Sequence, residues 1–206
     1  MKELRGHLLT PAGWQRGALR LEDGRIAAVE GEAVDEATVR ADAATPLLLP
    51  GFVDTHVHGG GGADTMDAGD AALTLARLHA RHGTTSLLAT TMTAPLADIE
   101  AALRALAPLV AKRPAGSARV LGVHLEGPYI SPERLGAQPA FARAPSAAEL
   151  LALNALAPIR LVTLAPEVSG MLAMIPALVD AGMRVQIGHT AASYEQATEA
   201  MALGAS

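Results

Sequence analysis

From Pro50 onward the sequence alternates short strand-like runs with longer helical stretches rich in Ala and Leu. The predicted strands cover 51–57, 84–91, 119–126, 160–164 and 184–188, and the predicted helices lie near 68–81, 95–111, 147–155, 170–181 and 194–203. Regular alternation of a strand with a helix builds βαβ units, in which successive strands run parallel in one sheet. The alternation therefore predicts an α/β fold for most of the chain.

The number of these units indicates which α/β fold to expect. Five units agree with part of a (β/α)8 TIM-like barrel, whose complete form has eight units and about 250 residues. An open doubly wound sheet is the alternative, but the first strand is not followed by the glycine pattern G-x-G-x-x-G of dinucleotide-binding folds. The four glycines at 59–62 lack that spacing, so residues 50–206 are predicted to form the first five βα units of a barrel.

Residues 1–49 follow a different pattern. Short apolar stretches are separated by Gly and Asp-Gly turns, and Asp23-Gly24 between two such stretches is typical of a β-hairpin. This segment is therefore predicted to be a separate small antiparallel sheet that precedes the barrel units.

Composition excludes several classes of protein. The 206 residues contain no cysteine, which excludes a disulfide scaffold, a thiolate zinc site and a cysteine nucleophile. Five aromatic residues and a net charge of -5 argue against a nucleic-acid partner. We also expect no membrane partner and a cytoplasmic location, because the N-terminus lacks the apolar run of a signal peptide and no run of 18 apolar residues occurs.

Metal-ligating residue types are found where the predicted strands end. His56 and His58 are two apart on one strand, so they share a face of the sheet with Asp54. Glu126 ends the third strand, two residues after His124. An isolated pair or a single residue of this kind is often structural, but active sites of barrels lie at the carboxyl ends of strands.

The fifth predicted strand adds His189 at its carboxyl end. Together, His56, His58, Glu126 and His189 form a nitrogen and oxygen donor set that suits Zn²⁺ or a neighbouring divalent metal, with Fe²⁺, Mn²⁺ and Co²⁺ also permitted. Asp54 is expected to support the site rather than bind the metal. The remaining histidines, His7, His79 and His82, are assigned to the surface.

Five segments of the sequence resemble one enzyme family. The segment 50–58 (PGFVDTHVH) is similar to the amidohydrolase superfamily in general, and 124–129 (HLEGPY) with 136–139 (GAQP) resembles the N-acetylglucosamine-6-phosphate deacetylase family. The segments 163–167 (TLAPE) and 188–191 (GHTA) agree with that family in the same order. The resemblance covers the entire chain, and it implies that residues 1–49 are part of a small β-sandwich domain.

The resemblance implies roles for the candidate metal ligands. Glu126 and His189 match ligands of the metal site that all members have, and His56 and His58 match the pair that completes a second site in some members. One or two metal ions are therefore expected. Several related amidohydrolases bridge two metals with a carboxylated lysine. The two lysines of this chain, at position 2 and after a predicted helix at position 112, cannot do so.

The resemblance also implies a reaction. It is the metal-dependent hydrolysis of N-acetylglucosamine 6-phosphate, in amino-sugar catabolism, to glucosamine 6-phosphate and acetate. Ala137, through its backbone, and Gln138 match the loop that contacts the sugar. The family's catalytic aspartate has no counterpart up to Ser206, so no catalytic residue is assigned in this chain. A homodimer is expected at full length.

Two alternatives stay open. The chain could be an inactive truncated fragment of such an enzyme, because it is expected to cover only the N-terminal part of the family's fold. It could also belong to an amidohydrolase that acts on another N-acyl substrate, such as a different acetylated sugar or an aminoacyl compound.

Overall fold

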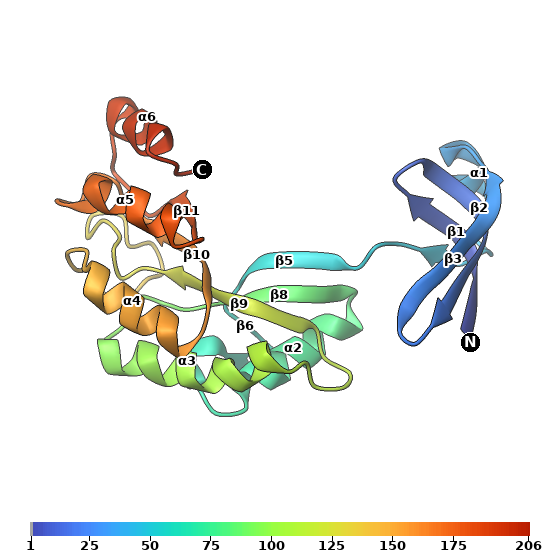
Figure 1. Cartoon of the computed structure of the whole chain (residues 1–206), viewed down its shortest axis with the longest axis horizontal. Helices are drawn as coiled ribbons and strands as arrows, with labels where there is room; N and C mark the ends of the chain where they lie inside the picture. Colours follow the sequence, from blue (N-terminus) through green and yellow to red (C-terminus); the bar gives the residue numbers. More distant parts are fainter. Residues whose placement is uncertain (1) are drawn as a thin grey trace. The chain divides into compact units, whose positions relative to one another are not determined.

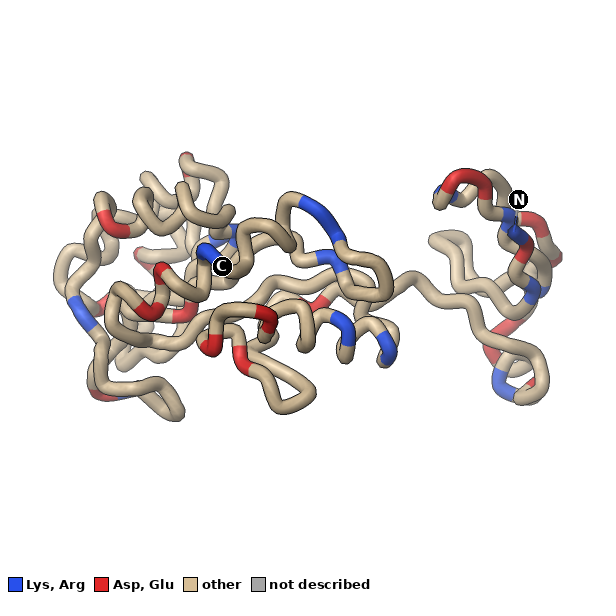
Figure 2. The backbone as a smooth tube through the Cα atoms, turned by 90° about the horizontal axis from the view of Figure 1, so that it is seen from below, with Lys and Arg blue, Asp and Glu red and all other residues tan. Residues whose placement is uncertain are grey.

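The computed structural model describes residues 2–206, which divide into two compact units, one up to Gly51 and one from Phe52 to Ser206 (Figure 1). Each unit has its own sheet. Acidic and basic residues are dispersed along the backbone of both units (Figure 2). Within residues 2–206, no helix combines the length and the apolar character that crossing a membrane requires.

The first unit is a four-stranded sheet with one short helix. Its elements are β1 (Lys2–Thr10), β2 (Gly13–Glu22), β3 (Arg25–Ala33), α1 (Glu36–Ala41) and β4 (Leu47–Leu48). The strand order is β3-β2-β1-β4, in which the first three strands are antiparallel and β4 runs parallel to β1. The predicted hairpin is confirmed, since β2 and β3 are joined by the turn at Asp23 and Gly24.

His7 contradicts its assignment to the surface. It lies on β1 with no exposed surface, and its Nε2 is 3.2 Å from Asp42 Oδ2. A buried imidazole needs a polar partner, and the loop that follows α1 supplies one. Of the other two histidines, His82 is exposed as expected, whereas His79 is half-buried with its Nε2 3.1 Å from the carbonyl oxygen of Gly59.

The second unit is an α/β half-barrel. Its five long strands form a parallel sheet in the order β11-β10-β9-β8-β5, so that successive strands of the sheet are also successive along the chain. These elements are β5 (Phe52–Val57), α2 (Ala71–Arg81), β8 (Thr84–Thr90), α3 (Leu96–Ala111), β9 (Arg119–Glu126), α4 (Ala147–Leu156), β10 (Ile159–Leu164), α5 (Met171–Asp180), β11 (Arg184–Ile187) and α6 (Tyr194–Ala202). The prediction of a partial (β/α)8 barrel with five βα units is confirmed.

The core of the second unit lies between the sheet and its helices. Helices α2, α3 and α4 cover one face of the sheet (Figure 1). In α3, Ile99, Leu103 and Leu106 are completely buried, and their spacing of four and three residues places them on one side of the helix. They join buried strand residues such as Leu87 and Leu125 in a single cluster. This packing fixes the strands whose carboxyl ends carry the predicted ligands.

The predicted boundaries differ from the observed ones by three residues at most. The sequence did not predict three small elements after β5. These are β6 (Gly59–Gly60) and β7 (Ala63–Asp64), which pair as a hairpin, and the 3₁₀ turn η1 (Thr65–Asp67). The four-glycine run therefore forms a short hairpin that follows the two predicted histidine ligands.

Candidate metal centre

The four predicted ligands come from three strands and meet at one end of the sheet. His56 lies near the carboxyl end of β5 and His58 just after it, Glu126 ends β9, and His189 follows β11. Parallel strands bring their carboxyl ends to the same edge, and curvature of the sheet turns these side chains toward one another.

Glu126 is the centre of this group. Its Oε2 lies 2.8 Å from His58 Nε2 and 3.4 Å from His56 Nε2, and its Oε1 lies 2.9 Å from His189 Nε2. The two β5-end imidazoles are also close, with 3.1 Å between their Nε2 atoms. The donor atoms of His56, His58 and Glu126 all lie within 4.8 Å of one another, a spacing that one metal ion could span.

The electrostatics keep Glu126 ionised. The residue is only 4% exposed. Burial by itself would raise the pKa of its carboxyl, but the hydrogen bond from His58 and the nearby charges of His56 and His58 outweigh burial and lower the pKa to about 2. The same hydrogen bond raises the pKa of His58. A buried carboxylate faced by imidazole nitrogens has the charge that a divalent cation requires.

The orientation of His189 tests whether this donor set suits a cation. Its Nδ1 lies 3.0 Å from the carbonyl oxygen of Arg134, which can only accept, so Nδ1 carries the hydrogen. In the neutral ring Nε2 then presents a lone pair to Glu126 Oε1. Two facing acceptors 2.9 Å apart need a shared proton or a metal ion between them. The residues present therefore suit a bound divalent cation.

His124 packs next to the candidate metal ligands, but its ring nitrogens are bonded to residues other than Glu126. It is completely buried, its Nδ1 donates to the carbonyl oxygen of Thr55 at 3.1 Å, and its Nε2 lies 2.7 Å from Thr163 Oγ1. Burial lowers its pKa to about 4, so the ring is neutral near pH 7. Its ring packs edge-on against His56 with 4.8 Å between centroids. His124 therefore packs against one predicted ligand while its own nitrogens are bonded elsewhere.

Of the two predicted sugar-contacting residues, Gln138 is buried and Ala137 is exposed. Gln138 is buried, and its Nε2 donates to Glu126 Oε2 at 2.8 Å while its Oε1 accepts from the Thr93 amide at 2.6 Å. The side-chain amide thus orients the Glu126 carboxylate. Ala137 is exposed next to it. Asp54 lies outside the donor group, and its Oδ1 accepts from the His56 amide at 3.1 Å.

Sequence reasoning missed several residues that support the site. Thr163 bonds His124, and Glu167 accepts from Thr190 and from the backbone amide of Ala191, directly after His189. A signal for the first was available, because Thr163 is a polar residue between two apolar neighbours in the strand. No periodicity could have indicated Glu167, since its partners are 23 and 24 residues away along the chain.

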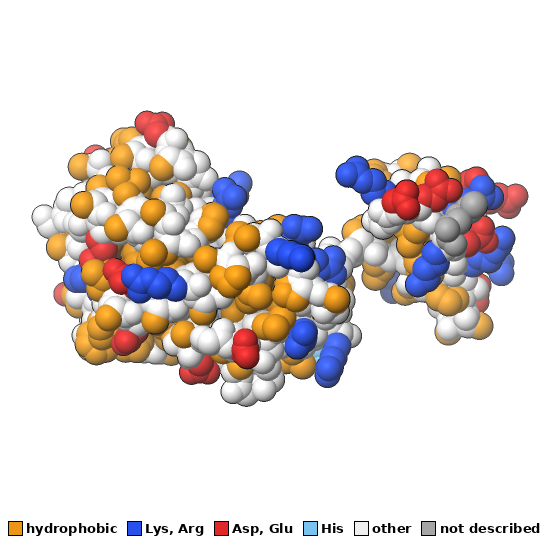
Figure 3. Space-filling view, turned by 60° about the horizontal axis from the view of Figure 1, so that its bottom comes forward, with side chains coloured by type: hydrophobic (Ala, Val, Ile, Leu, Met, Phe, Trp, Pro, Cys, Tyr) orange, Lys and Arg blue, Asp and Glu red, His pale blue; other side chains and the backbone are white. Residues whose placement is uncertain are grey.

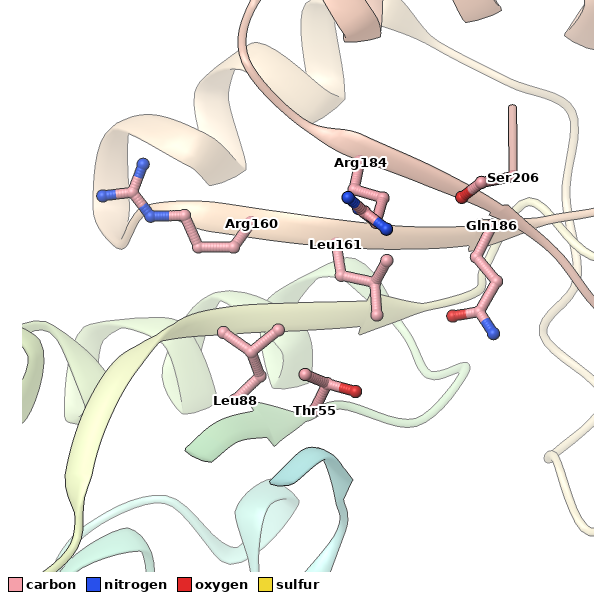
Figure 4. A pocket seen from close by; sticks show the side chains of 7 residues that line it. All are labelled: Thr55, Leu88, Arg160, Leu161, Arg184, Gln186 and Ser206. Carbon is pink, nitrogen blue, oxygen red and sulfur yellow. The ribbon is translucent and has the colours of Figure 1, made fainter. Parts of the chain in front are cut away.

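A cavity of about 400 Å³ lies on the face of the sheet that helices α2 to α4 do not cover (Figure 4). It is lined by residues of β5, β8, β10 and β11 and by Ser206. Arg160 and Arg184 lie at the amino ends of β10 and β11, and neither forms an ion pair within residues 2–206. Thr55, which accepts the hydrogen bond from His124, is also part of the lining.

Comparison with known proteins identifies the relatives of this chain. The family described as "Amidohydrolase family" matches residues 47–204. The chain is 44% identical to an N-acetylgalactosamine-6-phosphate deacetylase of Escherichia coli O157:H7, over 96% of this chain and 52% of the relative. It is 39% identical to an N-acetylglucosamine-6-phosphate deacetylase of Bacillus subtilis (strain 168), over 93% of this chain and 50% of the relative.

Solved structures give the same result. The crystal structure of N-acetyl-D-glucosamine-6-phosphate deacetylase from Mycobacterium smegmatis superposes with a TM-score of 0.84 at 34% identity, over 100% of this chain and 55% of that chain. The enzyme of the same name from Thermotoga maritima gives a TM-score of 0.83 at 31% identity, over 98% and 53%. The chain spans about half the length of the curated relatives it matches.

Proposed function

The chain belongs to the amidohydrolase family, and on that premise we propose that it is the metal-binding part of a deacetylase. The proposed reaction is hydrolysis of the acetamide of N-acetylglucosamine 6-phosphate to give glucosamine 6-phosphate and acetate. One observation carries the proposal. Three histidines converge on the buried carboxylate of Glu126, in a chain whose relatives are named as deacetylases of acetylated hexosamine phosphates.

The side chains have distinct tasks in this proposal. Glu126 and His189 would hold the primary metal, for which the nitrogen and oxygen donors favour Zn²⁺ and also permit Fe²⁺, Mn²⁺ and Co²⁺. When bound, the ion supplies Lewis acidity that polarises the amide carbonyl and acidifies water. Gln138 fixes the Glu126 carboxylate through its side-chain amide, and the Arg134 carbonyl fixes the ring of His189.

His56 and His58 would complete a second metal position. Their Nε2 atoms both face Glu126 Oε2, whereas His189 faces the other oxygen, so the carboxylate can serve two positions at once. The variant His56→Asn tests this proposal. Elemental analysis should show a loss of up to one metal per chain while the ion held by Glu126 and His189 is retained. Unchanged stoichiometry from a two-metal parent would refute the assignment of His56.

The sugar is proposed from the relatives, two of which differ in the configuration of the hexosamine they are named for. We propose that the loop with Ala137 and Gln138 contacts the sugar. The buried Gln138 side chain is bonded to Glu126 and Thr93, which leaves the exposed Ala137 backbone as the freer contact. A homodimer, a cytoplasmic location and the absence of nucleic-acid and membrane partners stay predictions.

Acetate release by the purified, zinc-loaded full-length gene product tests the function. N-acetylglucosamine 6-phosphate should be hydrolysed, N-acetylglucosamine without phosphate should not, and chelation of the metal should abolish turnover. Preference for N-acetylgalactosamine 6-phosphate or for a different N-acyl compound would replace the proposed substrate. Metal binding without acetate release by residues 1–206 alone would favour the alternative that these residues hold the metal but lack the complete catalytic apparatus.

A further inference from the structure

His189 has an unusual backbone conformation for a residue with a side chain. Its φ is +49°, in the left-handed region that glycine, asparagine and aspartate adopt more readily. Within residues 2–206, only Asp23 and Ala68 share a positive φ among the non-glycine residues. Such conformations persist where the surrounding structure holds them, and they are concentrated at functional sites.

Two contacts hold His189 itself. The backbone amide of Ser131 donates to the His189 carbonyl oxygen at 2.9 Å, and the ring Nδ1 donates to the Arg134 carbonyl oxygen at 3.0 Å. Both contacts come from the loop between β9 and α4. The first fixes the peptide plane that follows His189 and the second orients the ring, but the positions of residues 190 and 191 also depend on other interactions.

Glu167 supplies those interactions. It lies in the loop after β10, half-buried, and its two carboxylate oxygens accept from the two residues that follow His189. Oε2 accepts from the Thr190 hydroxyl at 2.5 Å, and Oε1 accepts from the Ala191 amide at 2.6 Å. Hydrogen bonds to an ionised carboxylate are short and roughly twice as strong as neutral ones.

We propose that Glu167 is a positioning residue that fixes the left-handed turn at His189 and so aims its Nε2 at the metal. Within residues 2–206, the Glu167 side chain forms no hydrogen bond with His189 or Glu126, so its effect passes through residues 190 and 191. The inference rests on the proposed role of His189 as a metal ligand, and it assigns a task to a carboxylate that the deacetylation chemistry itself does not use.

A carboxylate of the first unit provides a matched control. Asp42 Oδ2 accepts from the Thr45 hydroxyl at 2.7 Å, and its Oδ1 accepts from the Thr45 amide at 3.2 Å. Like Glu167, it fixes a loop by accepting from a threonine hydroxyl and a backbone amide, but its partners are not among the residues that hold His189. Its removal should affect the stability of the first unit without redirecting His189.

The test compares Co²⁺ binding by four proteins: wild type, Glu167→Ala, Glu167→Gln and Asp42→Ala. The dissociation constant is measured by competition with a chelator, and the visible absorption bands report the coordination of the ion. Glu167→Ala should weaken binding by about 10 to 100-fold and alter the bands, as is typical when a partner of a metal ligand is lost. Glu167→Gln should stay within about threefold of wild type, because its amide can accept from Ala191 and donate to the Thr190 oxygen.

Asp42→Ala should leave both readouts unchanged, even if its melting temperature falls. Wild-type affinity and bands in Glu167→Ala, or equal weakening in Asp42→Ala, would overturn the proposal. A crystal structure of metal-free Glu167→Ala decides the point independently of metal binding, since retention of φ near +49° at residue 189 would also refute it. Failure of the proposed function is distinguishable, because it appears as a metal-loaded wild type that releases no acetate.

Discussion

The two units of this chain use their apolar residues in different ways. In the first unit, Ile26, Val29 and Leu47 are exposed, and a cavity of about 520 Å³ with a largely apolar lining opens on the sheet. In the second unit, strand residues such as Leu125 and Val162 are completely buried under helices. Apolar side chains reach the surface of both units (Figure 3). Among residues 2–206, the buried apolar cluster that helices cover on one side consists of residues of the second unit.

The candidate metal ligands lie in the unit with the closed core. Every predicted ligand lies at a carboxyl end of the parallel sheet of the second unit, where packing fixes the backbone to which it is attached. The first unit has a buried histidine of its own, His7, but its nitrogen faces a single carboxylate, Asp42. A metal-ligating residue type therefore indicates a site only where the topology gathers several of them.

The largest expected effect is the loss of Glu126. In the full-length gene product, we expect Glu126→Gln to lower acetate release at least about a thousandfold, which corresponds to about 4 kcal/mol, because a neutral amide is a poor ligand for the proposed metal. Metal content should fall in parallel. Glu30→Gln in the first unit, where Glu30 pairs with Arg20 on the surface, is the matched control and should change neither quantity. Full activity with full metal content in Glu126→Gln would contradict the assignment.

The next largest effect is on stability, because the two units enclose their apolar side chains to different extents. Leu125→Ala should cost about 4 kcal/mol of unfolding free energy, since Leu125 is completely enclosed and truncation leaves a cavity. Leu8→Ala should cost about 2 kcal/mol, because Leu8 borders the open cavity of the first unit.

The aromatic residues allow each unit to be followed separately. Trp14, the single tryptophan, lies in the first unit, and both tyrosines lie in the second. Urea unfolding measured by tryptophan fluorescence and by the near-ultraviolet circular dichroism of tyrosine therefore reports the two units in one experiment. If Leu125→Ala and Leu8→Ala lowered the free energy of unfolding equally, the proposed difference between a closed and an open core would be refuted.

The sequence predicted some of these features and not others, for physical reasons. Strand and helix periodicity predicted all five βα units, because burial between sheet and helices imposes that pattern locally. The convergence of the candidate ligands was predictable from residue type at strand ends. The burial of His7, the bond from Gln138 to Glu126 and the contacts of Glu167 were not, because each depends on a pairing between distant segments that leaves no mark on local pattern.

The stability of the metal-free protein should depend on pH through the titration of His124. The pKa of His124 falls from about 6.5 unfolded to about 4 in the folded state, so the unfolded chain binds more protons between these values and stability drops with falling pH. Between pH 6 and pH 4.5 the second unit should lose about 2 kcal/mol. The raised pKa of His58 acts with the opposite sign, but its contribution is present below about pH 6.5, so it changes little in this window.

Tyrosine-monitored urea unfolding at several pH values measures this loss. The variant His124→Gln cannot titrate, and its stability should vary less steeply over the same interval. An equally steep slope in His124→Gln would assign the pH dependence to other groups.

The smallest expected effect is a loss of stability in two glycine variants, which distinguishes the cost of backbone strain from the cost of a steric collision. Gly24 in the first unit and Gly127 in the second have nearly the same φ, +73° and +74°. A Cβ on Gly24 would meet no atom within 4 Å, whereas one on Gly127 would collide with Thr93 Oγ1. Gly24→Ala should therefore cost only the left-handed conformation itself, about 1 kcal/mol by tryptophan fluorescence, with metal affinity unchanged. Gly127→Ala adds the collision beside Glu126, so it should cost more and weaken metal binding. If the two variants lost equal stability, φ alone would set the cost, and the closer packing of the second unit would have no part in it.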